Sequence, residues 1–97
     1  LPHATANSEP SWFGFAFGTD RRNELARYLD AHQIGNRPLF GGNITRQPSM
    51  RNVDYRVSGE LRNSDYVHEN VIWIGCWPGL TKEQLDYSIE VIRGFYK

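Results

Sequence analysis

The chain has 97 residues, with 11 basic and 11 acidic side chains and therefore no formal net charge. This length accommodates one small domain, and the balanced charge argues against nucleic-acid binding. No apolar run is long enough to span a membrane, and no secretory signal is visible. The single cysteine, Cys76, excludes an internal disulfide and a multi-cysteine metal site. We therefore expect a cytoplasmic protein without membrane or nucleic-acid partners.

Residues 1–10 are polar and bracketed by prolines, which predicts a linker that leads in from an upstream segment. Residues 11–97 are expected to form the domain. Aromatic and small residues alternate over 11–17, which predicts a strand with three phenylalanines on one face. The other face carries Gly14 and Ala16, whose small size would let a helix or another domain approach closely.

Thr19 and Asp20 are typical N-cap residues, and apolar residues follow them at helical spacing. This pattern predicts a helix over residues 20–32. His32 lies in its last turn, where a cation at the helix end is a better interpretation than a catalytic group. A proline within residues 37–40 indicates a short edge strand, because proline cannot donate to a central ladder.

Residues 41–63 show no convincing helical or alternating period, and a loop this long in a small domain is usually functional or disordered. Its apolar residues argue against disorder. A capping cluster at 63–65 predicts a short helix that ends near residue 70. A hydrophobic strand is expected over 71–77, and Cys76 within it is interpreted as a small core residue.

A capping box of Thr81 and Gln84 begins the last helix. Apolar positions at helical spacing predict that its buried stripe consists of Leu85, Ile89, Ile92 and Tyr96. Together the elements predict an α+β fold, with a small, mostly antiparallel sheet and helices on one face. The other face carries aromatic residues that so small a domain cannot bury, which predicts a partner surface.

The loop after the edge strand holds residue types that bind anions and hydroxyl groups. Nine of the 11 basic residues are arginines, and eight of them lie in residues 21–62, where the local net charge is +4. Guanidinium groups suit phosphate, adjacent glycines expose backbone N–H groups, and Asn and Thr add neutral hydrogen bonds. The candidate ligand-binding residues are Arg37, Gly41, Gly42, Asn43, Thr45 and Arg46. Alternatively, the arginines simply solvate the surface. The three histidines lie far apart in the sequence, so no metal site is expected.

Four segments of the chain resemble one family. These are residues 11–15 (SWFGF), 34–48 (IGNRPLFGGNITRQP), 55–65 (YRVSGELRNSD) and 73–81 (WIGCWPGLT). They resemble the C-terminal part of the vitamin-B6-dependent nucleotide-sugar 3-dehydratases of the aminotransferase-like superfamily (DegT/DnrJ/EryC1/StrS). The likeness is strongest to the members that act on CDP-4-keto-6-deoxyglucose. It covers nearly the whole chain, in order and with natural spacing.

The resemblance implies that residues 11–97 are the C-terminal small domain of a type I aminotransferase fold. In that family an upstream domain holds pyridoxamine 5′-phosphate, a histidine replaces the usual Schiff-base lysine, and the C3 hydroxyl of a 4-keto-6-deoxy sugar is removed. The CDP-sugar members also carry a [2Fe–2S] cluster for a subsequent reduction, which implies a reductase partner. The implied setting is a homodimer that acts on nucleotide-diphosphate sugars for lipopolysaccharide O-antigens or dideoxysugars.

The chain itself contains none of this catalytic machinery. Its only lysines are Lys82 and Lys97, and one cysteine cannot hold a cluster. We therefore expect no catalytic residue, bound cofactor or metal in this chain alone, and no activity without the upstream domain. By matching position, the loop resembles the family's substrate-side loop, with Arg37 and Arg46 facing the nucleotide diphosphate or cofactor phosphate and Asn43 facing sugar hydroxyls.

Two alternatives remain open at the level of sequence. The first is the same domain of a nucleotide-sugar aminotransferase, which uses pyridoxal phosphate and keeps the lysine. The second is a self-standing binding module that docks on a partner through the aromatic face of its sheet.

Overall fold

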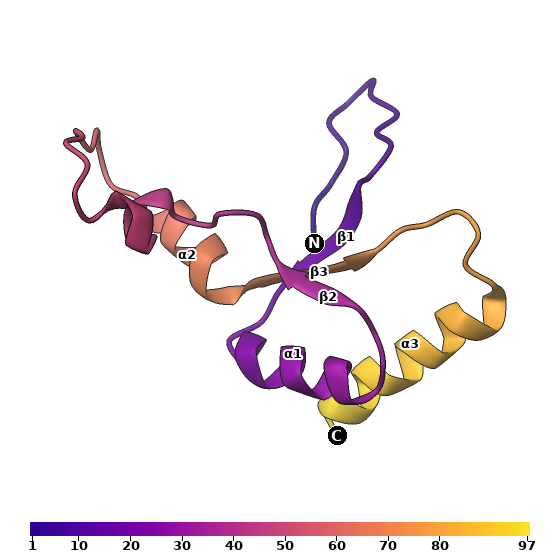
Figure 1. Cartoon of the computed structure of the whole chain (residues 1–97). Coiled ribbons are helices and arrows are strands. Elements are labelled where there is room, and N and C mark those ends of the chain that lie inside the picture. The colour runs from indigo at the N-terminus through magenta and orange to yellow at the C-terminus, as the bar shows by residue number, and fades with distance from the viewer.

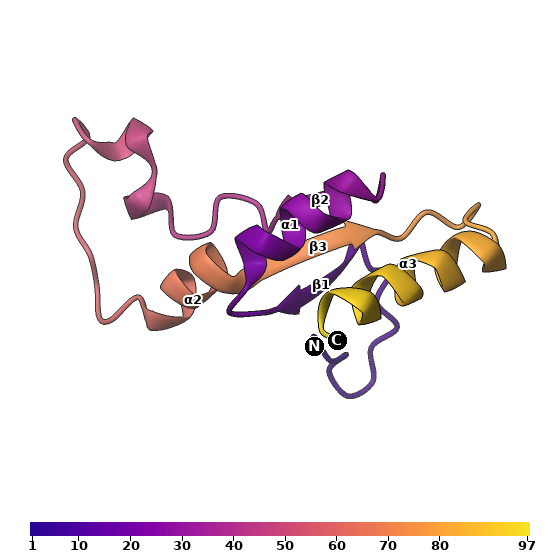
Figure 2. The same ribbon diagram turned by 90° about the horizontal axis from the view of Figure 1, so that it is seen from below.

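A three-stranded antiparallel sheet with helices on one face forms the domain. The computed structural model describes residues 1–97. The elements, in chain order, are β1 (Gly14–Gly18), α1 (Arg22–Ala31), β2 (Asn36–Pro38), the 3₁₀ helices η1 (Ile44–Arg46) and η2 (Pro48–Met50), α2 (Arg62–Asn70), β3 (Val71–Gly75) and α3 (Lys82–Phe95). Strand β3 lies between β1 and β2 and pairs antiparallel with both. Helices α1 and α3 lie next to each other on one side of the sheet (Figures 1 and 2). The predicted α+β class is confirmed.

The core lies between the middle of β3 and the two covering helices. Ile72 packs with Leu25 and Leu29 of α1 and with Val91 of α3, and the first three of these side chains are fully buried. Successive strand residues point to opposite faces, so Ile72 and its partner across β1, Phe17, face the helices. Only seven of the 97 residues are buried, so this core leaves much of the apolar surface uncovered.

The opposite face of the sheet carries a cluster of three aromatic rings. The Trp73 ring centroid lies 4.9 Å from that of Phe13 and 5.4 Å from that of Phe40. A Cβ atom at Gly14 would overlap the Trp73 ring, so the small residue accommodates an indole of the same chain. Phe13 and Phe40 remain 77% and 74% exposed. The expected aromatic, unburied face is therefore present, although Phe13 packs on Trp73 rather than beside Phe15 and Phe17.

The buried face of α3 differs from the predicted stripe. Val91 is buried, and Ile92 and Phe95 pack against the core. Three residues of the predicted stripe are instead about half exposed, namely Leu85, Ile89 and Tyr96. Both stripes have helical spacing and share Ile92, so periodicity alone does not choose between them. The first turns of α3 extend past the end of the sheet (Figure 2), which leaves their apolar side chains uncovered.

Cys76 is exposed, so its interpretation as a core residue is wrong. Strand β3 ends at Gly75, two residues earlier than predicted, and Gly14–Gly75 is the last pair of the ladder with β1. Past that pair the chain leaves the layer that the helices cover. The edge strand β2 is also shorter than predicted, because Phe40 has a φ of +46° and breaks the extended conformation.

The helix starts show which capping signals act locally. The capping box of Thr81 and Gln84 at α3 is confirmed, with both reciprocal hydrogen bonds present. Helix α1 begins after Arg21 without a side-chain cap, and Thr19 instead accepts a hydrogen bond from the Arg21 N–H at 3.2 Å. Helix α2 begins at Arg62, also without a side-chain cap. None of the helices is long and apolar enough to cross a bilayer.

We predict that Gly14→Ala destabilises the domain, because the new methyl group displaces the Trp73 ring from its place over β1. Such overpacking typically costs about 1–3 kcal/mol of unfolding free energy, measurable by denaturant unfolding. Gly35→Ala is the matched control, since a Cβ at Gly35 meets no atom within 4 Å. Its effect is expected to stay within about 0.5 kcal/mol. Equal stability of the two variants would contradict the packing of Trp73 on Gly14.

Candidate functional site

Asn43 fastens the loop after β2 to helix α2. The residue is 3% exposed. Its Nδ2 donates to Asp65 Oδ1 at 2.7 Å, and its Oδ1 accepts from both the backbone N–H and the hydroxyl of Thr45, at 3.0 and 2.7 Å. Its own backbone N–H donates to His68 Nδ1 at 3.3 Å. Asn43 thus caps η1 and links it to two side chains of α2.

Asp65 also holds Arg46 through two hydrogen bonds. Arg46 Nε donates to Asp65 Oδ1 at 3.1 Å and Arg46 Nη2 donates to Asp65 Oδ2 at 3.2 Å. The hydrogen bond from Arg46, and then the one from Asn43, hold the pKa of the Asp65 carboxyl below its ordinary value. The same pairing raises the pKa of the Arg46 guanidinium. The Arg46 side chain remains 59% exposed, so part of its donor fork still faces solvent.

The glycines of the loop allow its close approach to α2. Gly42 has a φ of +57°, and a Cβ atom there would lie 2.7 Å from the Cα of His68. Both the left-handed conformation and the contact favour glycine. Gly41 accepts a hydrogen bond at its carbonyl from Gln47 Nε2 at 2.8 Å. The loop over residues 41–47 is therefore held in place by hydrogen bonds and by its close contact with α2.

Arg37 lies apart from this fastened loop. It is in register with Trp73 on the open face of the sheet, and its side chain makes no ion pair. With Phe13, Phe40 and Trp73 it lines an open depression of about 720 Å³. The structure therefore joins Gly41, Gly42, Asn43, Thr45 and Arg46 in one loop cluster, and places Arg37 with the aromatic rings.

The α2 side chains that hold the loop are absent from the sequence-predicted site. The sequence pattern places Asp65 in a helix-capping cluster and indicates no role for His68. One signal was available for Asp65: it lies within residues 55–65, one of the segments that carry the family resemblance. The hydrogen bonds from residues 43 and 46 depend on tertiary contacts between positions about 20 residues apart, which local pattern does not specify.

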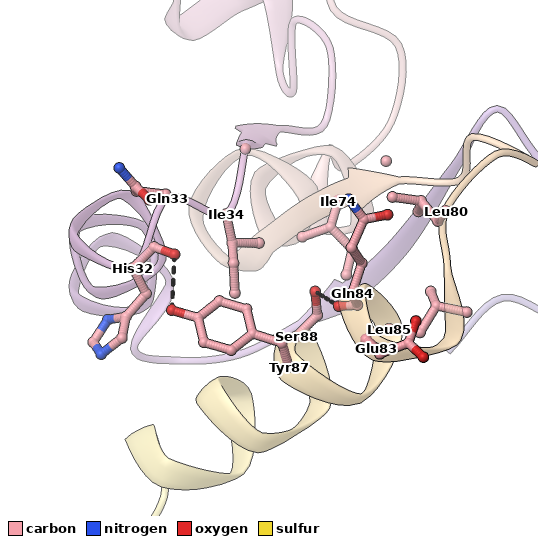
Figure 3. Close-up of a pocket in the computed structure, with 12 residues that line it drawn as sticks. His32, Gln33, Ile34, Ile74, Leu80, Glu83, Gln84, Leu85, Tyr87 and Ser88 are labelled. Carbon is pink, nitrogen blue, oxygen red and sulfur yellow. Dashed lines mark hydrogen bonds between the residues drawn. The ribbon is translucent and has the colours of Figure 1, made fainter.

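A separate groove of about 610 Å³ lies between the end of α1 and the start of α3 (Figure 3). Ile34 and Ile74 form part of its wall, and Tyr87 donates a hydrogen bond to the His32 carbonyl across it at 3.2 Å. None of the sequence-predicted site residues lines this groove.

Neither lysine of this chain belongs to the loop cluster. Lys82 is paired with Asp86 on the exposed side of α3, and the other lysine is the last residue, Lys97. No three His, Cys, Asp or Glu side chains are grouped so that they could hold a metal ion. The donors around Asp65 are of a kind that binds a ligand with acceptor oxygens.

Known proteins resemble this chain over nearly its whole length. The DegT/DnrJ/EryC1/StrS aminotransferase family matches residues 1–93. The lipopolysaccharide biosynthesis protein RfbH of Salmonella typhimurium is 48% identical over 99% of this chain and 23% of its own length. The dTDP-4-dehydro-2,6-dideoxy-D-glucose 3-dehydratase of Saccharopolyspora spinosa is 45% identical, over 98% of this chain and 22% of its own.

A more distant relative is the GDP-4-keto-6-deoxy-D-mannose 3-dehydratase of Escherichia coli O55:H7. It is 29% identical over 88% of this chain and 24% of its own length. The chain thus spans less than a quarter of each of these relatives. The resemblance seen in the sequence is confirmed: this chain belongs to the DegT/DnrJ/EryC1/StrS aminotransferase family.

Proposed function

We propose that this chain is the C-terminal, substrate-positioning domain of a nucleotide-sugar 3-dehydratase, which removes the C3 hydroxyl of a 4-keto-6-deoxy sugar. In this proposal residues 1–10 are a linker from an upstream domain that holds pyridoxamine 5′-phosphate. The protein acts in the cytoplasm as a homodimer, in the synthesis of lipopolysaccharide or dideoxysugars. If the substrate is a CDP-sugar, the proposal also includes a [2Fe–2S] cluster and a reductase partner.

The observation that carries the proposal is the loop cluster held by Asp65. A nucleotide sugar offers a diphosphate and several hydroxyl groups, which require fixed cationic and neutral donors. Arg46 offers the part of its fork that Asp65 leaves unused, and Gly41 offers an exposed backbone. Fixing such donors before the substrate arrives reduces the entropy that is lost on binding.

The relatives support the same reaction class with different nucleotides. Two of them are named as 3-dehydratases, one of a dTDP-sugar and one of a GDP-sugar. This chain matches both over most of its length. We propose that it acts on the diphosphate and sugar elements that such substrates share, with Arg37 and Arg46 near phosphate. The role of Asn43 toward sugar hydroxyls stays a prediction, since its side chain faces Asp65 and Thr45 here.

An aminotransferase is the second candidate, favoured by the name of the family itself. The two reactions differ in their products, so one assay separates them. The full-length protein is incubated with pyridoxamine 5′-phosphate and a nucleotide-linked 4-keto-6-deoxy sugar, and the product is analysed by mass spectrometry. Loss of the C3 oxygen supports the dehydratase. Replacement of the C4 ketone by an amino group, with glutamate and pyridoxal phosphate, would identify an aminotransferase instead.

Arg46→Ala is expected to raise the KM for the nucleotide sugar about tenfold or more in the full-length protein, because a charged hydrogen-bond donor is lost. The melting temperature should hardly change, since exposed ion pairs contribute little stability. Arg51→Ala, at an exposed position just after η2, is the matched control and should leave both quantities unchanged. A fall in melting temperature without a change in KM would show that Arg46 serves the structure alone.

Acid pH should release the loop cluster from α2. Because the folded-state pKa of Asp65 is lowered, its stabilising effect is present at neutral pH and is lost as the pH falls below about 4. We therefore expect Asp65→Asn to have a lower melting temperature than the wild type at pH 7, and the difference to shrink toward pH 3. A difference that is constant across this range would rule out the charged Asp65 as the anchor.

A further inference from the structure

A smaller cavity lies between the Gly41–Gly42 segment and helices α1 and α2. Its volume is about 210 Å³, and its polar lining comes from Arg22, Gln47, His68 and the two glycines. No carboxylate lines it, and its one permanently charged side chain is Arg22, from the first turn of α1. The cavity therefore has a positive character, although the chain as a whole is neutral.

Arg22 carries a buried donor without an acceptor. Its Nε is one of only two buried side-chain nitrogen or oxygen atoms in the chain that lack a hydrogen-bond partner. The side chain also makes no ion pair, in contrast to its neighbour Arg21, which pairs with Glu24 at 2.9 Å. The Arg22 charge therefore has no counter-charge among the side chains of this chain, which leaves it available to an anion in the cavity that it lines.

Three other groups that line the cavity offer donors. His68 Nδ1 accepts the hydrogen bond from the Asn43 N–H, so the neutral ring carries its proton on Nε2. The backbone N–H of Gly41 makes no hydrogen bond within the chain. Gln47 uses one amide hydrogen on the Gly41 carbonyl and keeps a second. A ligand with several acceptor oxygens and a negative charge would complement this set.

From these donors we infer that the cavity binds a phosphate group, with Arg22 as its charged partner. Gly41 lets an anion approach its free backbone N–H, whereas the Gly42 N–H donates to the Leu39 carbonyl at 3.1 Å. The Arg22 fork matches phosphate geometry. The assignment of this phosphate to the diphosphate of a nucleotide sugar rests on the proposed function. The cavity and the aromatic depression that Arg37 lines share Pro38 and Phe40 in their walls.

The test measures binding to the full-length protein by titration calorimetry, with two probes. Inorganic pyrophosphate represents the diphosphate of the substrate, and pyridoxamine 5′-phosphate represents the cofactor phosphate. Arg22→Gln should raise the Kd of pyrophosphate about tenfold, and Arg22→Lys, which keeps the charge, should recover part of the affinity. Arg27→Gln, at an exposed position of the same helix, is the control and should bind like the wild type.

The stability of the ligand-free protein provides an independent readout. Because Arg22 Nε has no partner to lose, Arg22→Gln should melt no lower than the wild type without ligand. Its melting temperature should then rise less than that of the wild type when pyrophosphate is added. A variant that melts lower and is not rescued by Arg22→Lys would show a structural role for Arg22 and overturn the phosphate site.

The remaining outcomes separate the two proposals. An unchanged Kd for both probes in Arg22→Gln overturns the phosphate site, even if the protein is a 3-dehydratase. A loss confined to pyridoxamine 5′-phosphate overturns the assignment to the substrate. Arg22-dependent pyrophosphate binding in a protein that leaves the C3 hydroxyl in place supports the cavity and refutes the proposed function.

Discussion

The Asp65 carboxylate connects the loop after β2 to the rest of the fold. It accepts hydrogen bonds from Asn43 and Arg46, two residues of a segment that otherwise contributes no strand or long helix. Helix α2, which carries Asp65, continues without a break into the central strand β3 (Figure 1). The loop is thereby connected through α2 to the middle of the sheet. A ligand that binds the loop is thereby linked through α2 to the central strand.

The remainder of the fold follows from having three short strands and one layer of helices. Helices α1 and α3 cover one face, and the core around Ile72 is small. The opposite face keeps an aromatic cluster at its surface, and the first turns of α3 expose apolar side chains past the end of the sheet. Because this chain spans less than a quarter of each reported relative, such uncovered surfaces fit a domain that functions inside a larger protein.

Sequence patterns predicted the features that depend on neighbours along the chain. The alternation of Ile72 and Trp73 and the capping box at Thr81 are set within a few residues, and both are present. The predicted buried stripe of α3 is wrong because two faces of this helix carry apolar residues at helical spacing. Which face is buried depends on how far the sheet extends beneath the helix. Cys76 is not a core residue, because β3 ends at Gly75, which forms the last pair of the ladder with Gly14 of β1.

The candidate site was predictable only in part. Gly41, Gly42, Asn43, Thr45 and Arg46 do come together, because they are close in sequence. Their anchors on α2 and the Arg22 side chain on α1 come from distant positions, and residue type alone gives no indication of these contacts. The proposed reaction class comes from the resemblance to a known family, because the residues of this chain do not specify a reaction.

Hydrogen–deuterium exchange of the full-length protein tests most directly whether the loop contributes to substrate binding. The backbone amides of residues 41–46 are compared with and without a nucleotide-linked 4-keto-6-deoxy sugar. If the loop holds the substrate, exchange at these amides slows when the sugar is bound, while exchange in the exposed part of α3 is unchanged. Unchanged exchange at residues 41–46, together with protection elsewhere in a protein that binds the sugar, would contradict the account.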